Sequence, residues 1–242
     1  MSWRSRRSME VLARGLSLSA LITAIGLCGM SAFAQESAPA ETEMRLGSLI
    51  PWRIDRPTPT QREGTRVLYR FGNCTVEAKP EDSAQLLRMS PGQEGEMTII
   101  SRLAGTDNGC LRGAQSMSLS LIPFRGSIAN ALYLRDYAAF PADRLAASAE
   151  TAGEMLTGDP KNLLPDFARC VVRSEPALVD ALLRTRPASD DEHGALQRLS
   201  GTFPSCLFRG QVLEANALTL RSILADAAYS LSLASSAPDT AG

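Results

Sequence analysis

The sequence is poor in the side chains that build most metal and hydrolase centres. It has one histidine, His193, which follows an acidic run and is expected to be a solvated surface residue. Zinc sites of the usual kind need several histidine or thiolate ligands. The chain also has no glycine-rich phosphate loop and, after residue 34, no GxSxG motif of a serine nucleophile. We therefore expect no metal, no cofactor and no catalytic residue that a motif would reveal.

Long hydrophobic runs are also missing. After residue 34 no stretch approaches the roughly 18 to 20 apolar residues that a membrane-spanning helix needs. At the N-terminus, a short apolar run over 16–30 follows several arginines and precedes Ala32-Phe33-Ala34. This pattern is typical of a secretory signal peptide cleaved near Ala34 and Gln35. We expect a periplasmic or secreted protein that does not span a membrane after signal removal, and we leave the choice between the general and twin-arginine export routes open.

The charge of the mature chain excludes one class of partner. The whole sequence has a formal net charge of −1, and residues 1–34 contribute four Arg and one Glu, so the remainder carries −4. The mature chain has no basic run, and lysine occurs only at Lys79 and Lys161. A mildly acidic chain of this kind is not expected to bind nucleic acid or an anionic membrane surface.

The cysteines of the mature chain form two evenly spaced pairs. Cys74 and Cys110 are 36 residues apart, and so are Cys170 and Cys206. An even number of cysteines in an exported chain predicts disulfides, and the absence of a CxxC motif favours a structural role over a redox role. Four cysteines allow three pairings, but a duplicated unit most simply closes its own bridge, so we expect Cys74–Cys110 and Cys170–Cys206.

The equal spacing belongs to an internal repeat. Residues 68–133 align without a gap to residues 164–229, at an offset of 96. Infrequent residue types supply much of the match, which composition alone would not explain. Examples of the identical pairs are Phe71 with Phe167, Pro80 with Pro176, Pro91 with Pro187, Arg125 with Arg221 and Tyr133 with Tyr229. The sequence therefore predicts two tandem copies of one unit.

Each copy is expected to be helical. Apolar residues recur at helical spacing around each first cysteine, Pro80 and Pro176 suit a first helical turn, and Ser120 and Asn216 suit N-caps of a long fourth helix. The predicted fold class is all-α, with two tandem disulfide-stapled units of about four helices each. The predicted divisions are 1–34 signal peptide, 35–63 flexible Pro-rich arm, 64–133 helical repeat 1, 134–160 connecting segment, 161–233 helical repeat 2 and 234–242 disordered tail.

Charged residues that recur in both copies are the only candidates for a binding site. They are Arg88, Glu96, Arg102 and Arg125, with Arg184, Glu192, Arg198 and Arg221 at the matching positions. One interpretation is a duplicated anion-binding set made by Arg88, Arg125, Arg184 and Arg221. The alternative interpretation is that these residues are helix-end charges and surface ion pairs.

Part of the second copy resembles a known group of sequences. The run Cys170-Val171-Val172-Arg173-Ser174-Glu175-Pro176, followed by Leu182-Leu183-Arg184 and later by Cys206-Leu207, is similar to a motif of uncharacterised exported proteins of sphingomonad-type bacteria. The first copy diverges, because Thr75 and Glu77 replace Val171 and Arg173. The resemblance implies export and repetition, and it implies no activity.

These observations favour a non-enzymatic exported helical protein that binds or scaffolds an envelope protein or surface component. The alternative is a hydrolase-type enzyme whose site is assembled only in the fold. An enzyme should show a deep pocket with two or more buried ionisable groups, in one copy only. A binding module should show a shallow groove lined by apolar residues or arginines.

Overall fold

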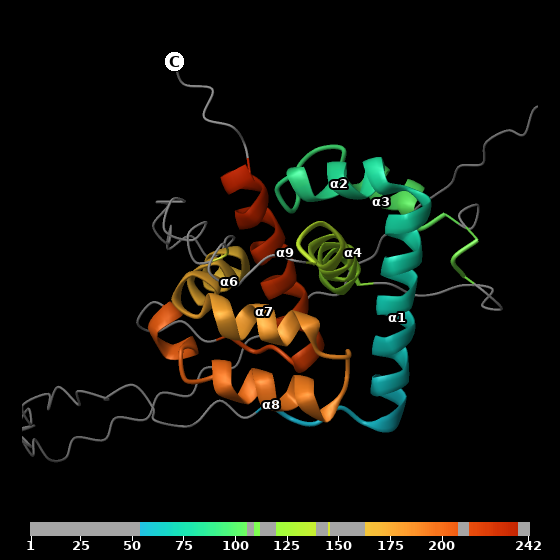
Figure 1. Ribbon diagram of the computed structural model, residues 1–242. Helices are drawn as coiled ribbons and strands as arrows, with labels where there is room; N and C mark the ends of the chain where they lie inside the picture. Colours follow the sequence, from blue (N-terminus) through green and yellow to red (C-terminus); the bar gives the residue numbers. More distant parts are fainter. Residues whose placement is uncertain are drawn as a thin grey trace, which may run out of the picture. The chain divides into compact units, whose positions relative to one another are not determined.

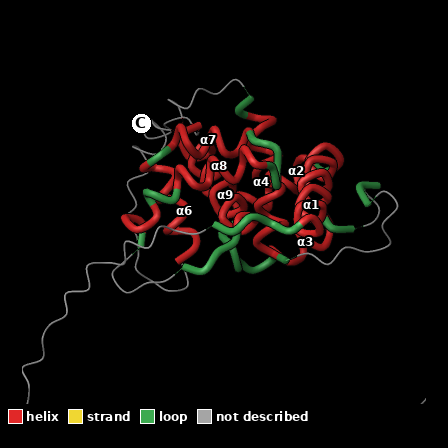
Figure 2. The backbone as a smooth tube through the Cα atoms, turned by 90° about the horizontal axis from the view of Figure 1, so that it is seen from below, coloured by secondary structure: helices red, strands yellow, loops and turns green. Residues whose placement is uncertain are grey.

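The computed structural model describes residues 54–105, 109–111, 120–138, 145, 163–207 and 213–236. Regular structure in these residues is helical throughout, as Figure 2 shows, so the prediction of an all-α fold is confirmed. The helices are α1 (Pro59–Ala78), α2 (Pro80–Arg88), α3 (Glu96–Leu103), α4 (Leu121–Asp136), α6 (Leu163–Ser174), α7 (Pro176–Arg184), α8 (Asp190–Leu199), the short 3-10 helix η3 (Phe203–Cys206) and α9 (Ala217–Ser236).

The described helices fall into two series, which we call the N-terminal half (α1 to α4) and the C-terminal half (α6 to α9). Helix α7 begins and ends 96 residues after α2, and α9 begins 96 residues after α4. The spacing of these helices equals the offset at which the sequence matches itself. Both halves belong to one compact unit that starts at Arg45.

The two disulfides link helices within each half. Cys74 of α1 bonds to Cys110, which follows α3, and Cys170 of α6 bonds to Cys206 of η3. Both expected pairings are thereby confirmed.

Helix α1 begins earlier than the sequence pattern suggested. The Thr58 side chain accepts a hydrogen bond from the backbone N–H of Gln61, and the Gln61 side chain accepts one from the N–H of Thr58. This capping box, with Pro59 in the first helical turn, starts the helix at Pro59. Ile54 is also buried in the core. The flexible arm expected to reach residue 63 was therefore wrong for its last part, because the signal of the capping box was overlooked.

Helices α4 and α9 form the most extensive helix pair of the described residues and lie between the other helices (Figure 1). They approach so closely that a Cβ atom on Gly126 of α4 would collide with the Cα and Cβ atoms of Ser222 of α9. Gly126 and Ser222 occupy positions 96 apart. Contact between matching positions is the property of a two-fold, isologous interface.

Each half adds its own helices to this central pair. Helix α1 packs on α4, where the rings of Phe71 and Phe124 meet at a tilt. Helix α6 packs on α9 and on η3, where the rings of Phe167 and Phe203 meet edge to face. The buried apolar side chains of both halves join in one core. Because this core is continuous, the halves share their stabilising burial.

Several predicted segments fall wholly or mostly outside the described residues. These are the signal peptide, residues 35–53 of the arm, most of the connecting segment and residues 237–242 of the tail. Leu145 in the connecting segment is helical and buried. The tail prediction was wrong for residues 234–236, which belong to α9. No helix among the described residues is long and apolar enough to cross a membrane.

Candidate functional site

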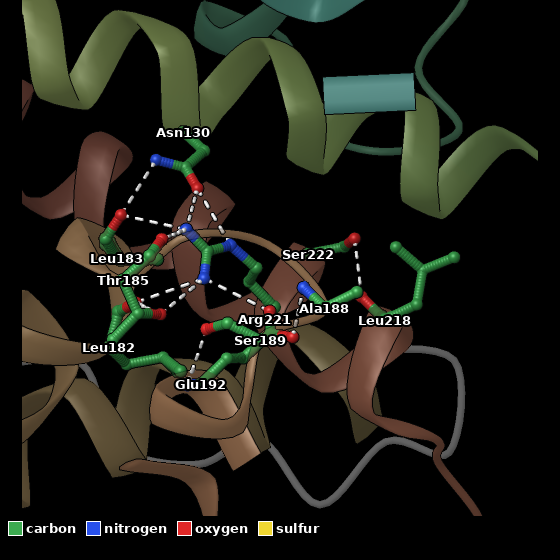
Figure 3. Close-up of polar contacts among 10 residues, drawn as sticks. All are labelled: Asn130, Leu182, Leu183, Thr185, Ala188, Ser189, Glu192, Leu218, Arg221 and Ser222. Carbon is green, nitrogen blue, oxygen red and sulfur yellow. Dashed lines mark hydrogen bonds and ion pairs between the residues drawn. The ribbon is translucent and has the colours of Figure 1, made fainter. Parts of the chain in front are cut away.

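Arg221 of α9 lies at the centre of a buried polar cluster (Figure 3). Its guanidinium donates two hydrogen bonds to the side-chain oxygen of Asn130 on α4, at 2.8 and 3.0 Å. It donates another to a carboxylate oxygen of Glu192 on α8, at 3.1 Å. It also donates to the backbone oxygens of Leu182, Leu183 and Thr185, where α7 ends. The Arg221 side chain is 1% exposed. A buried charge of this kind is tolerated because each donor finds an acceptor.

Arg125 of α4 makes a matching cluster in the N-terminal half. It donates to Glu96 of α3 at 2.9 Å, and to the backbone oxygens of Leu86 and Met89, where α2 ends. Each of these three partners lies 96 residues before a partner of Arg221. The two arginines therefore tie together the same elements of each half.

The glutamates of these clusters also close matching turns. The second carboxylate oxygen of Glu96 accepts from the N–H of Gly92 at 2.6 Å, and that of Glu192 accepts from Ala188 at 2.7 Å. Gly92 has a φ of 81° and Ala188 has a φ of 55°. Both angles lie in the left-handed region, which residues other than glycine rarely adopt. Burial raises the pKa of Glu192 above its ordinary value, while Arg221 and the Ala188 N–H act in the opposite direction.

The arginines reach across the interface between α4 and α9 in a reciprocal way. Arg221 of α9 donates to Asn130 of α4, whereas Arg125 of α4 donates to Asp226 of α9, at 2.7 Å. Asn130 and Asp226 occupy positions 96 apart. Each of the two helices thus accepts a hydrogen bond from the arginine of the other. The acceptor on α4 is the neutral amide of Asn130, and the acceptor on α9 is the carboxylate of Asp226.

The halves also differ in what covers each arginine. The ring of Tyr69, from α1, stacks over the Arg221 guanidinium at 5.1 Å, and Tyr69 is buried. Position 165, which is 96 residues after Tyr69, is a proline at the start of α6. Pro165 is too small to cover Arg125 in the same way. A groove is open beside Arg125, and both residues line it.

This groove, which we call the Arg125 groove, has a volume of about 1150 Å³ and is open to solvent on one side. It lies between α4, α6, α9 and the turn after α2. Its apolar lining includes Leu87, Leu121, Ile122, Leu163, Leu164, Ile223 and Leu233. Leu121 and Ile122 are 40% and 38% exposed, which is unusual for large apolar side chains.

Two aspartates of the groove set it apart from the matching region around Arg221. The Asp226 side chain is 19% exposed, and its Oδ1 atom has no hydrogen-bond partner. Asp166 is 9% exposed and lies 4.0 Å from Arg169. The residues at the matching positions are Asn130 and Arg70. The groove therefore has carboxylates at two positions where the matching residues carry a guanidinium group and an amide.

The structure places the four arginines of the anion-binding interpretation in different environments. Arg125 and Arg221 are buried and held by partners within the chain, so a bound anion would have to displace one of those partners. Arg184 is held by Asp180 at 2.9 Å and donates to the backbone oxygens of Tyr137 and Ala138. Arg88 is exposed at the rim of the groove and donates to the backbone oxygen of Ala84.

Two expectations about surface charges were wrong. The pairs of Glu96 with Arg125 and of Glu192 with Arg221 are buried, because the glutamates lie on the inner faces of α3 and α8. His193 is 8% exposed rather than solvated, because the face of α8 that follows its acidic first turn packs against the core.

The sequence analysis missed the residues that distinguish the halves. It compared identical positions, whereas the informative ones are non-identical pairs: Tyr69 with Pro165, and Asn130 with Asp226. The same alignment at an offset of 96 contains both differences. The alignment shows these two differences in sequence, but it does not show that Pro165 and Asp226 both lie beside Arg125.

The fold and the site define an all-α, disulfide-linked protein with a half-open groove of mixed apolar and charged lining. No group of His, Cys, Asp and Glu suited to hold a metal ion occurs among the described residues. Comparison of the chain with protein-family models, with curated proteins and with solved structures gave no match.

Proposed function

We propose that this protein is an exported ligand-binding protein of the cell envelope, built from two copies of one helical unit. In this proposal the copies pack through α4 and α9, the region around Arg221 is closed and supports the fold, and the Arg125 groove, lined by residues of both halves, is the binding site. The observation that carries the proposal is the difference between the matching regions. Tyr69 covers Arg221, whereas Pro165 leaves the Arg125 groove open.

The size and lining of the groove support a small ligand. Binding pockets for small molecules are concave and mostly apolar, with a few polar groups that orient the ligand, and have volumes of about 300–1000 Å³. The Arg125 groove is slightly larger and has this composition. Exposed leucine and isoleucine at its mouth offer apolar surface whose burial by a ligand is favourable.

An envelope location fits the two disulfides, which persist in oxidising compartments. Support for the duplication comes from the matched helices, the matched bridges and the reciprocal arginine contacts at one offset. The similarity to exported sphingomonad-type proteins agrees with both parts of the proposal.

A hydrolase-type enzyme is the second candidate. Asp166 and Asp226 line one groove, and the other half has no acid at either matching position. Paired carboxylates are the usual groups of glycoside hydrolysis. However, Asp226 already accepts a hydrogen bond from Arg125, and a carboxylate held in this way is better suited to fix a ligand than to move during a reaction.

Filling the groove tests the binding function. Pro165→Tyr places beside Arg125 the side chain that Tyr69 provides over Arg221. With the neutral apolar dye Nile red, we expect the wild-type protein to give enhanced fluorescence and the variant to bind at least about fivefold more weakly, since a tyrosine side chain removes much of the apolar contact area.

The matched control is Ala177→Tyr, which adds the same side chain at an exposed position of α7 outside the groove. It should bind the dye as the wild type does. Equal dye binding by the wild type and the Pro165→Tyr variant, with both folded by circular dichroism, would contradict the proposed site.

A further inference from the structure

We propose that the ligand of the Arg125 groove is an amphipathic organic amine, with its ammonium group on Asp226 and its apolar body against the leucine and isoleucine walls. This inference rests on the proposed binding function and specifies the class of ligand. It depends on a difference in charge between the two halves.

The centre of the groove has one negative charge more than its counterpart. Around Arg125 there are two carboxylates, Glu96 and Asp226, so the three groups sum to a formal charge of −1. Around Arg221 there is one carboxylate, Glu192, because Asn130 takes the position of Asp226, and the formal sum is zero. The closed cluster around Arg221 is therefore neutral, and the open cluster around Arg125 has a surplus carboxylate.

The surplus carboxylate lines the groove and is partly exposed, with its Oδ1 atom buried against the protein. Glu96 is 2% exposed and bonded through both oxygens, to Arg125 and to the N–H of Gly92. Asp226 is 19% exposed and uses one oxygen for Arg125. Its other oxygen, Oδ1, has no hydrogen-bond partner, whereas the side-chain oxygen of Asn130 accepts from two nitrogens of Arg221. A partly buried carboxylate with an unused acceptor is stabilised by a cationic donor.

The other charged groups of the groove do not cancel this preference. Asp166 and Arg169 of α6 lie 4.0 Å apart and neutralise each other. Arg88 is exposed at the rim, where water and salt screen its charge. Glu96 and Arg125 are fixed by their mutual bond. Asp226 therefore remains as the group that selects the charge of the ligand.

The walls of the groove select an apolar body. Leu163 and Leu164 of α6, Ile223 and Leu233 of α9, and Leu121 and Ile122 of α4 surround the space beside Asp226. A ligand with a hydrocarbon chain would bury these side chains, whereas a small hydrophilic amine would leave them in water. The chemistry of the site thus requires both a cationic head and an apolar tail.

Three probes with the same tail separate these requirements. Binding of n-decylamine, n-decanol and n-decanoate to the full mature protein is measured by isothermal titration calorimetry at pH 7, below the concentrations at which the probes aggregate. We expect n-decylamine to bind at least about tenfold more tightly than n-decanol, and n-decanoate to bind most weakly, because a charge-assisted hydrogen bond is roughly twice as strong as a neutral one.

The matched variant is Asp226→Asn, which introduces the residue found at the matching position of the N-terminal half, Asn130. It should lose the preference for n-decylamine over n-decanol. A preference for n-decanoate, equal binding of n-decanol and n-decylamine by the wild type, or a preference that persists in Asp226→Asn would overturn the inference while leaving the proposed binding function intact. If none of the three probes binds, the proposed function fails as well.

Discussion

Arginine is the side chain that the two buried clusters require. Its planar head group has five N–H donors in a fixed geometry, which lets Arg221 bond at once to a carboxylate, an amide oxygen and the carbonyl groups at the end of α7. A lysine has three donors on a flexible stem and could not replace it. The recurrence of Arg125 and Arg221 in the sequence therefore reflects a structural need.

The sequence identified these arginines but not their environment. Each lies on the fourth helix of its half and meets a glutamate 29 positions before it in the chain. That separation exceeds the reach of any helical periodicity. The bond depends instead on how α3 packs on α2 and α2 on α4, and on how α8 packs on α7 and α7 on α9. Identical charged residues at one offset could therefore suggest either a surface pair or a buried one.

Glu192 should make the stability of the protein depend on pH. Its pKa is raised above the ordinary value of 4.5, mainly by burial. Between that value and the raised one, the folded protein binds more protons than the unfolded chain, so the free energy of unfolding falls as the pH rises. In Glu192→Gln this contribution is absent. Urea denaturation from pH 4 to pH 8 should show the wild-type free energy decreasing relative to that of the variant, and then levelling off.

Glu214→Gln, which changes an exposed acid, is the control for this experiment. If the wild-type free energy instead rises with pH relative to that of Glu192→Gln, the attraction of Arg221 outweighs burial and the assigned direction is wrong.

The helices show which local signals are sufficient. The starts of α2 and α7 at Pro80 and Pro176 were predicted because proline fits a first helical turn. The start of α1 was missed because its capping box lies in a Pro-rich stretch whose composition suggested a loop. Glu175 takes the N-cap position of α7, directly after Ser174, the last residue of α6.

The disulfides act at the level of these elements, since each joins the first helix of a half to the segment after its third. Both enclose the same sequence separation of 36. In the chain-entropy account, each bridge should stabilise the fold by about 4 kcal/mol. We expect Cys74→Ala/Cys110→Ala and Cys170→Ala/Cys206→Ala to lose similar amounts, measured as the midpoint and slope of urea denaturation.

A loss near zero for one double variant would show that its loop is already ordered in the unfolded chain or that the native bridge is strained. The wild-type protein treated with reductant, in which both bridges open, provides the reference for the combined loss.

At the scale of the whole molecule, the contact between α4 and α9 joins the halves. Gly126 allows this approach because it has no Cβ atom, which would collide with Ser222. Gly72 similarly admits Ser127, whose Oγ atom would lie 2.7 Å from an added Cβ. The arginines then cross the interface, so that each half completes the polar cluster of the other.

Gly126→Ala should therefore destabilise the protein, even though alanine favours a helix more than glycine does. The two helices would have to separate, and overpacking of this kind costs about 1–3 kcal/mol. Gly64→Ala is the matched control, since no atom lies within 4 Å of a Cβ added there. It should be neutral or slightly stabilising. A Gly126→Ala variant as stable as Gly64→Ala in urea denaturation would contradict the close packing.

By itself the sequence determined the helical class and the starts of α2, α4, α7 and α9, because these depend on local periodicity, on proline and on capping residues. The equal spacing of the cysteines made one disulfide pairing the simplest of three. Only the tertiary structure decided which residues meet across α4 and α9. It brought Asp226 to Arg125 and Asn130 to Arg221, and it opened a groove where Pro165 takes the place of Tyr69. The physical reason is that these contacts join residues about 90 to 100 positions apart, whose meeting depends on how whole helices pack rather than on local preference.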